Sequence, residues 1–322
     1  SSSAASDVYK RQGGDVTMTT QEQKTTRRKE LGIFLLFSFG LAWLLQIAAS
    51  KALLQGDAAL FSPLLSLSML CPLAGALACK LMFQSSLGVG WRPVFKGKLR
   101  WWAAAWFGPA LLTFLGAALY FLIFPARLDT SGTALLASMG PEWDLESLKQ
   151  ELGITPMSYL LTVALQAVSF APLINMLVAV GEEAGWRGFM MPRLTEVLGL
   201  WQARVVGGII WAVWHWPVIL LAGYEYGVNY LGAPVLGLLV WCVVCIALNT
   251  LLDWLYQKSG SIWVPSLAHG AFNAIAALPA LLIYPEDTYY SVLGPMPVGI
   301  ISILPALLLA VWVTVQQMRE QK

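Results

Sequence analysis

The sequence predicts an all-α, polytopic membrane protein with about eight transmembrane helices. Apolar residues make up 57% of the chain and charged residues only 12%, whereas a soluble domain carries about 25% charged residues. Apolar runs long enough to cross a bilayer, which takes about 20 residues, recur along the whole chain. Lysine and arginine gather in alternate connections between these runs, as expected for a protein that crosses a membrane repeatedly.

Eight apolar runs are assigned as spans, each to within a few residues. They are roughly 31–50, 58–79, 101–124, 157–191, 204–222, 233–254, 261–284 and 293–316. The first follows a basic cluster without a cleavable signal-peptide pattern, so we expect it to remain as an anchor. The fourth would be about 52 Å long as a helix, against a hydrocarbon core of about 30 Å. We therefore expect it to tilt, to break at Pro172 or to run past the membrane surface, and to end at Pro192.

The domain organisation is predicted to be simple. Residues 1–30 are expected to form a disordered cytoplasmic leader, of which residues 1–17 are rich in Ser and Gly and have a non-native character; Met18 is the expected start. Residues 31–322 are expected to form a single transmembrane domain, because no internal repeat divides them. The four cysteines lie within predicted spans, which favours buried free thiols over disulfides or a zinc ribbon.

Charge placement predicts that both termini are cytoplasmic. With eight spans, most basic residues fall on one side: Lys24, Arg27, Arg28, Lys29, Lys80, Arg92, Lys96, Lys98, Arg100, Arg193, Arg204, Lys258, Arg319 and Lys322. In the longest connection on the other side, 125–156, most of the charged residues are acidic. Within it, Asp144 to Leu152 is predicted to be a short amphipathic helix, and Thr155 with Pro156 to cap the start of the fourth span.

Two carboxylates and a guanidinium, Glu182, Glu183 and Arg187, stand near the end of the fourth run. Each charged side chain at a helix centre costs about 2.5–3.5 kcal/mol on insertion scales, which favours a functional role. Helical spacing lets Glu183 and Arg187 pair at i and i+4 and turns Glu182 toward a different direction. Glu182 is therefore expected to be the working residue, with Glu183 and Arg187 as a supporting pair.

The only two histidines, His215 and His269, also lie inside predicted spans. Each is eleven residues from a basic residue of the cytoplasmic side, as is Glu182. In a helix that separation is about 16 Å, so one layer of the membrane is expected to hold all three groups. Asn273 shares a helix face with His269, and Trp211 shares one with His215, where ordinary packing is its expected role. Asn249 and Asp253 are interpreted as a structural pair.

This set of residues favours hydrolysis of an acyl bond without a protein nucleophile. A carboxylate and a histidine at one depth can deprotonate water, with Glu182 as the base, and His269 with Asn273 can stabilise an oxyanion. The alternative is a zinc ion held by Glu182, His215 and His269 with water in the fourth position, although no His-Glu-x-x-His sequence is present. Two other classes stay open: a non-catalytic immunity or binding protein, and a proton-coupled transporter.

Glu182-Glu183-x-x-x-Arg187, Trp211-x-x-x-His215 and His269-x-x-x-Asn273, in this order on three apolar segments, resemble the CAAX protease and bacteriocin-processing (CPBP, or Abi) family, which includes the CAAX prenyl endopeptidases. The resemblance covers about 155–285, within predicted helices four to seven. It implies an eight-helix intramembrane endopeptidase whose site opens to the cytoplasm. Glu182 and His215 would activate water, and His269 and Asn273 would stabilise the oxyanion. Although the family names say metalloprotease, no metal is required.

The resemblance also implies the surroundings of the protein. We expect it in the plasma membrane of a prokaryote, in contact with membrane lipids and without a nucleic-acid partner. Its substrate would be a peptide or a protein, prenylated or not, in CAAX-type or bacteriocin-related processing. Trp211 stands where the eukaryotic pattern has Phe. This position lines the site, so the difference affects the transfer of prenyl specificity rather than the chemistry.

Overall fold

The computed structural model describes residues 20–140 and 143–320, and these residues are almost entirely helical. Within the described part of the chain the sole β-type feature is one isolated bridge, between Leu128 and Ile283. The main helices are α2 (Thr20–Leu54), α3 (Ala58–Ser68), α4 (Cys71–Phe83), α5 (Leu99–Ile123), α6 (Thr133–Met139), α7 (Leu145–Leu152), α8 (Pro156–Val168), α9 (Ala171–Gly185), α10 (Met191–Leu198), α11 (Leu200–Trp214), α12 (Trp216–Ala222), α13 (Val235–Ser259), α14 (Trp263–Ile275) and α15 (Leu304–Glu320). Short 3₁₀ turns are η1 (Pro125–Arg127), η3 (Leu278–Leu282) and η4 (Pro285–Tyr290), and η2 (Trp186–Met190) is a π turn. The all-α prediction is confirmed.

The chain is an integral membrane protein. By length and composition, six helical segments among the described residues can cross a membrane, and the bent pair of α8 with α9 and α10 makes a seventh. This is fewer than the eight spans predicted. Residues 1–19 of the predicted leader, 1–30, lie outside the described residues. The remaining residues, 20–30, belong to helix α2, which begins at Thr20.

The eighth predicted span has different bounds in the structure. The run 293–316 does not form one helix, because residues 293–303 are turns and α15 begins only at Leu304. α15 has 17 residues, which is short for a span. Pro295 and Pro297 lack the backbone N–H that a helix needs, and Gly294 has a φ of 146°, outside the helical region.

The fourth run breaks near Pro172, which was one of the three expected outcomes, but it does not end at Pro192 as predicted. α8 and the segment Ala171–Leu198 meet at an angle of 47°, and the break falls at Ser169 and Phe170, just before Pro172. The helix then continues past Pro192 and ends at Gly199, whose φ is 87°. The π turn η2 directly precedes Pro192 and widens the helix there, which accommodates a residue that cannot donate a backbone hydrogen bond.

Two helices in the connection between α5 and α8 begin with side-chain caps, of which the cap at Thr155 was predicted. Asp144 caps α7 through Ser147, and Thr155 caps α8 through Ser158, each in a reciprocal capping box. Pro156 takes the first helical position of α8. The predicted short helix and the predicted start of the fourth span are both confirmed.

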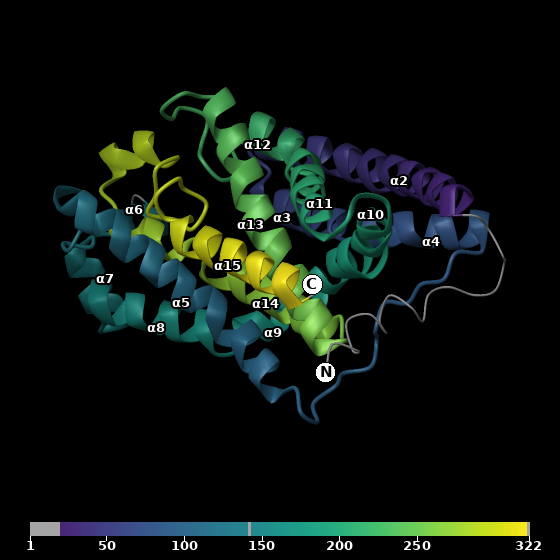
Figure 1. The fold of residues 1–322 in the computed structure, drawn as a ribbon. Coiled ribbons are helices and arrows are strands. Elements are labelled where there is room, and N and C mark those ends of the chain that lie inside the picture. The colour runs from purple at the N-terminus through teal and green to yellow at the C-terminus, as the bar shows by residue number, and fades with distance from the viewer. Residues whose placement is uncertain (1–19, 141–142, 321–322) are drawn as a thin grey trace.

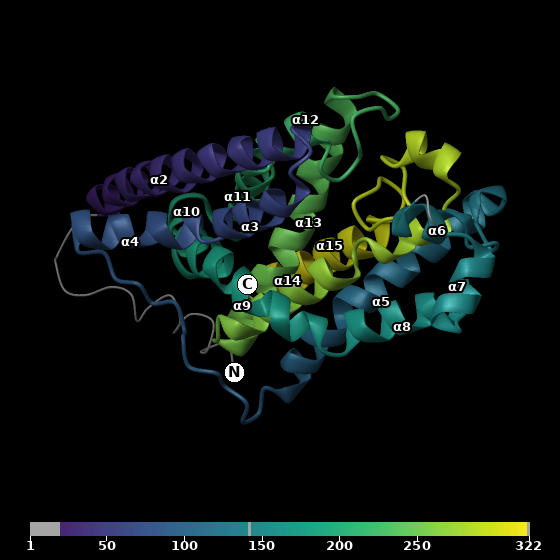
Figure 2. The same ribbon diagram turned by 180° about the vertical axis from the view of Figure 1, so that it is seen from behind.

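The helices form two groups that meet at the centre of the bundle. Figure 1 shows α2 and α4 on one side and α5, α7 and α8 on the other, with α13 between them. Figure 2 shows the same division from behind. α9 packs along α14, and α11 packs along α13. These two contacts bring the segments carrying Glu182, His215 and His269 together.

The predicted cytoplasmic end of the bundle is closed by buried ion pairs. Arg193 Nε donates to Glu30 over 2.7 Å, and Arg204 Nε donates to Asp253 over 2.9 Å, with all four side chains almost fully buried. Asn249 donates to the backbone carbonyl of Arg204. Asn249 and Asp253 thus occupy structural positions. All four cysteines are free, as predicted.

Gly270 sets the close approach of α14 to α9. A Cβ added at Gly270 would lie 2.5 Å from the backbone nitrogen of Met176 and 2.7 Å from the carbonyl oxygen of Pro172. Gly270→Ala is therefore expected to push the helices apart and lower the free energy of unfolding by about 1–3 kcal/mol. Thermal unfolding of the purified protein in detergent measures this.

The matched control for this substitution is Gly40→Ala. Gly40 lies in helix α2, and nothing stands within 4 Å of the added Cβ. It is expected to leave stability unchanged or to raise it by about 1 kcal/mol through helix propensity. Equal stability of the two variants would show that backbone contact at Gly270 does not limit the approach of α14.

Candidate active site

The four residues predicted to do the chemistry line one cavity. It has a volume of about 500 Å³ and is bordered by α3, α9, α11, α13 and α14. Its wall includes Glu182, His215, His269 and Asn273. The structure therefore brings together side chains from three separate segments of the chain, as the depth argument predicted.

Glu182 is fixed by two indoles. Its side chain is 1% exposed, and its Oε2 accepts hydrogen bonds from Trp186 Nε1 at 3.0 Å and from Trp211 Nε1 at 2.8 Å. No described residue hydrogen-bonds to Oε1, which leaves that oxygen for a water molecule in the cavity. The expected role of Trp211, ordinary packing, is incomplete, because the indole also orients the carboxylate.

His215 stands where α11 gives way to α12, immediately before Trp216 and Pro217. Its Nδ1 lies 2.9 Å from the backbone carbonyl oxygen of Trp211. A carbonyl can only accept, so Nδ1 carries the hydrogen and Nε2 of the neutral ring is an acceptor. That arrangement suits a group that takes a proton from water.

His269 is held by Glu183. The Nδ1 of His269 lies 2.8 Å from Oε1 of Glu183, and the same oxygen accepts from Arg187 Nη1 at 3.0 Å. The Glu183 and Arg187 side chains are 0% exposed, so the pair is wholly buried. The predicted pairing of Glu183 with Arg187 is present, and the bond to His269 is an addition that sequence reasoning missed.

The bond to Glu183 decides which form of His269 can act. Because the paired carboxylate accepts, Nδ1 carries a hydrogen, and Nε2 of a neutral ring then has none to donate. His269 can therefore donate to an oxyanion through Nε2 only as the imidazolium. Asn273 lies one turn further along α14 and borders the same cavity. Its amide N–H₂ is a donor whatever the protonation state of His269.

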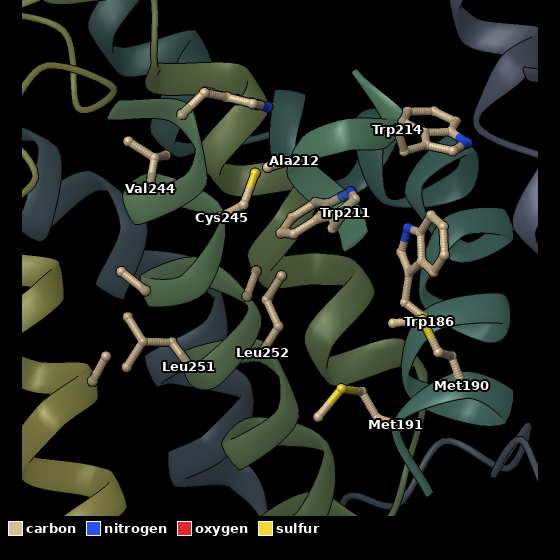
Figure 3. Close-up of a cluster of buried hydrophobic side chains, with 14 of the residues drawn as sticks. Trp186, Met190, Met191, Trp211, Ala212, Trp214, Val244, Cys245, Leu251 and Leu252 are labelled. Atoms are coloured by element: carbon tan, nitrogen blue, oxygen red, sulfur yellow. The ribbon is translucent and has the colours of Figure 1, made fainter. Parts of the chain in front are cut away.

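Aromatic side chains pack around the Glu182 carboxylate. In Figure 3, Trp211 lies beside Cys245 of α13, and Trp186 and Trp214 lie on the other side of Trp211. Trp186 and Trp214 pack edge to face at 6.1 Å. Trp186 follows Glu182 by four residues, so its i,i+4 contact was open to prediction from spacing alone.

The described residues do not fit a metal site. Among them, no three His, Cys, Asp or Glu side chains are arranged to hold a metal ion, and this includes the alternative set Glu182, His215 and His269.

The wall of the cavity reaches the end of the bundle opposite to the basic residues, and this end is called its mouth. Its wall reaches Phe61 in the first turn of α3, and Tyr224 and Glu225 in the turn after α12. These positions are at the far ends of the spans that carry Lys80 and Arg204. The resemblance implied a cytoplasmic opening, whereas with the predicted orientation these wall residues lie toward the other side. Which side of the membrane the mouth faces stays a prediction.

A second cavity adjoins the first and is almost wholly apolar. It has a volume of about 240 Å³ and lies between α5, α13, α14 and α15. Trp211 and His269 border both cavities. An apolar chain in the second cavity would therefore end beside the polar groups of the first.

Two comparisons bear on the family. Residues 162–275 match the family described as "Type II CAAX prenyl endopeptidase Rce1-like". A "CAAX prenyl protease 2" of Methanococcus maripaludis is 35% identical over 63 residues, which is 19% of this chain and 23% of that protein. The chain thus aligns with about a quarter of the length of this relative. The resemblance to CAAX prenyl endopeptidases that the three motifs predict is therefore confirmed for residues 162–275, the segment that is similar to the Rce1-like family.

Proposed function

We propose that the protein is an intramembrane endopeptidase that hydrolyses a peptide bond with a water molecule activated by Glu182 and His215. The observation that carries this proposal is the meeting of Glu182, His215, His269 and Asn273 on one cavity inside the bundle. The match to CAAX prenyl endopeptidases supports the same reaction class. Glutamate-type chemistry, rather than metallo-chemistry, is our proposal, because no three metal-ligating side chains among the described residues are arranged to hold an ion.

The proposed reaction begins with a water bound between Glu182 Oε1 and His215 Nε2. One of these groups removes a proton as the water oxygen attacks the substrate carbonyl. Asn273 and protonated His269 donate to the oxyanion of the tetrahedral intermediate. The leaving amine then takes a proton from the group that was protonated in the first step. Trp186, Trp211 and Glu183 position the reacting groups, and Trp211 also borders both cavities.

The substrate is proposed to be a peptide or protein segment in the membrane. The apolar cavity bordered by Trp211 and His269 offers space for an apolar chain, and a prenyl group is one that the relatives' names suggest. CAAX-type processing is therefore our first candidate. Bacteriocin-related processing, which the CPBP resemblance implied, uses the same chemistry on another peptide. The proposed unit is the transmembrane domain 31–322, with its core at about 155–285.

His215→Ala is expected to lower peptide hydrolysis by about 10²–10⁴-fold, because it removes a group that takes a proton from water. The assay uses purified protein in liposomes with internally quenched CAAX peptides, farnesylated and unmodified. Mass spectrometry of the products locates the cleaved bond. Trp241→Phe serves as control, because Trp241 packs on the His215 ring at 5.2 Å without taking part in the proposed proton transfer.

Two results would count against the proposal. Full hydrolysis by His215→Ala would remove His215 from the mechanism. Absence of cleavage of every peptide by the wild-type protein, together with transport of protons in sealed liposomes, would instead support the transporter class.

A further inference from the structure

One carboxylate of the cavity has no role in the proposed reaction. Glu225 lies in the turn between α12 and α13, outside the spans Leu200–Ala222 and Val235–Ser259. It is half-buried and borders the same cavity as Glu182. The structure gives its carboxylate no hydrogen bond or ion pair with any described residue. A charged group in this position lacks the partner that half-buried carboxylates normally have.

The cavity contains no cation that could serve Glu225. Neither lysine nor arginine is among the residues that border it, and the other titratable groups there are Glu182, His215, His269 and Tyr224. His269 is already bonded to Glu183, and His215 to the carbonyl of Trp211. Burial raises the pKa of Glu225 to about 7, which reflects the missing counter-ion.

The position of Glu225 also fits a substrate contact. It stands at the mouth of the cavity with Tyr224, whose side chain is 38% exposed, while Glu182 lies deeper and is 1% exposed. A peptide entering through this mouth therefore passes Glu225 before its scissile bond reaches Glu182. A cationic side chain a few residues from that bond would meet an unpaired carboxylate in a partly desolvated place.

We propose that Glu225 is a specificity-determining residue that binds a cationic group of the substrate, the ammonium of a lysine or the guanidinium of an arginine, at the mouth of the catalytic cavity. The inference rests on the proposed function and adds a substrate class to it: peptides with a positive charge beside the cleaved bond. The ion pair forms only when substrate is bound, so the free site stays accessible. No covalent step is involved.

The test is a series of internally quenched peptides that share one cleavage site. Lys, Gln or Glu is placed in turn at each position flanking the cleaved bond. For at least one position, the wild type is expected to prefer the Lys peptide over the Gln peptide by about tenfold in kcat/KM. Glu225→Gln is expected to remove that preference by raising KM for the Lys peptide, with kcat for the Gln peptide unchanged. Glu225→Lys is expected to favour the Glu peptide.

Glu286→Gln is the matched control. Glu286 is an exposed carboxylate in η4, on the same side of the bundle, and it does not border the cavity. It should leave every preference as in the wild type. If Glu225→Gln alters no preference, or lowers cleavage of all peptides equally, Glu225 does not recognise charge and the inference is wrong.

A binding measurement separates this inference from the proposed function. Fluorescence anisotropy reports binding of the labelled Lys and Gln peptides to the Glu182→Gln protein, which needs no cleavage. Tighter binding of the Lys peptide that disappears in Glu182→Gln/Glu225→Gln supports the inference even if the wild type cleaves nothing, a result that defeats the proposed function alone. Equal binding of both peptides overturns the inference.

Discussion

Glu182→Gln is expected to lower the rate of peptide hydrolysis by about 10²–10⁴-fold while the protein stays folded. Glutamine keeps the shape of the side chain, and its carbonyl oxygen can still accept from Trp186 and Trp211, which lie 3.0 and 2.8 Å from Oε2. What it loses is the ability to take a proton from water. Initial rates on the quenched peptides, compared at equal amounts of folded protein, measure the change.

Two further variants show whether the loss is chemical. Glu182→Ala removes the acceptor of both indoles and opens a hole, so it should lose stability as well as activity. Trp211→Phe removes one of the two hydrogen bonds to Glu182 and should lower the rate far less than Glu182→Gln. Full hydrolysis by Glu182→Gln would exclude Glu182 as the base. If that variant instead preserved a cellular phenotype without cleavage, the binding or immunity class would be favoured.

Local spacing predicted much of the site. The i,i+4 rule placed Glu183 beside Arg187, and the structure has them 3.0 Å apart. The caps at Asp144 and Thr155 can equally be predicted from the sequence, because each depends on residues within one helical turn. Apolar length also identified most of the spans, including the run 101–124, which stays one helix although Pro109 lies inside it. These features all depend on neighbours in sequence.

Contacts between distant segments were out of reach. Glu183 and His269 are 86 residues apart in sequence, and their bond depends on how closely α9 approaches α14 at Gly270. The donation from Trp211 to Glu182 depends in the same way on the packing of α11 against α9. The depth of His269 in the membrane predicts that it lies near the site. Without the packing of α9 on α14, it does not predict that Nδ1 contacts Glu183.

The direction in which the cavity opens shows the same limit. Charge placement predicts which end of each span is cytoplasmic, but not which end is filled by side chains. The basic end is closed because Arg193 and Arg204 are buried with carboxylates from α2 and α13, two partners that no local pattern assigns. The open end follows from the short α3 and α12, whose neighbouring turns leave Glu225 at the mouth.

Glu183→Gln is expected to lower the free energy of unfolding by about 3–5 kcal/mol and to abolish hydrolysis. The substitution leaves Arg187, which is 0% exposed, as a buried cation without its counter-charge. Two of its nitrogens, Nε and Nη2, already have no hydrogen-bond partner among the described residues. His269 at the same time loses the carboxylate that holds its ring. Thermal unfolding in detergent measures the first effect and the peptide assay the second.

The double variant Glu183→Gln/Arg187→Met separates these two effects. Replacing both charges of a buried pair with neutral groups of similar volume restores most of the stability that one substitution removes. Hydrolysis should stay low, because the carboxylate that holds the His269 ring is absent from this variant as well. Recovery of stability and hydrolysis together would show that Glu183 serves only as the counter-ion of Arg187, and that another group orients His269.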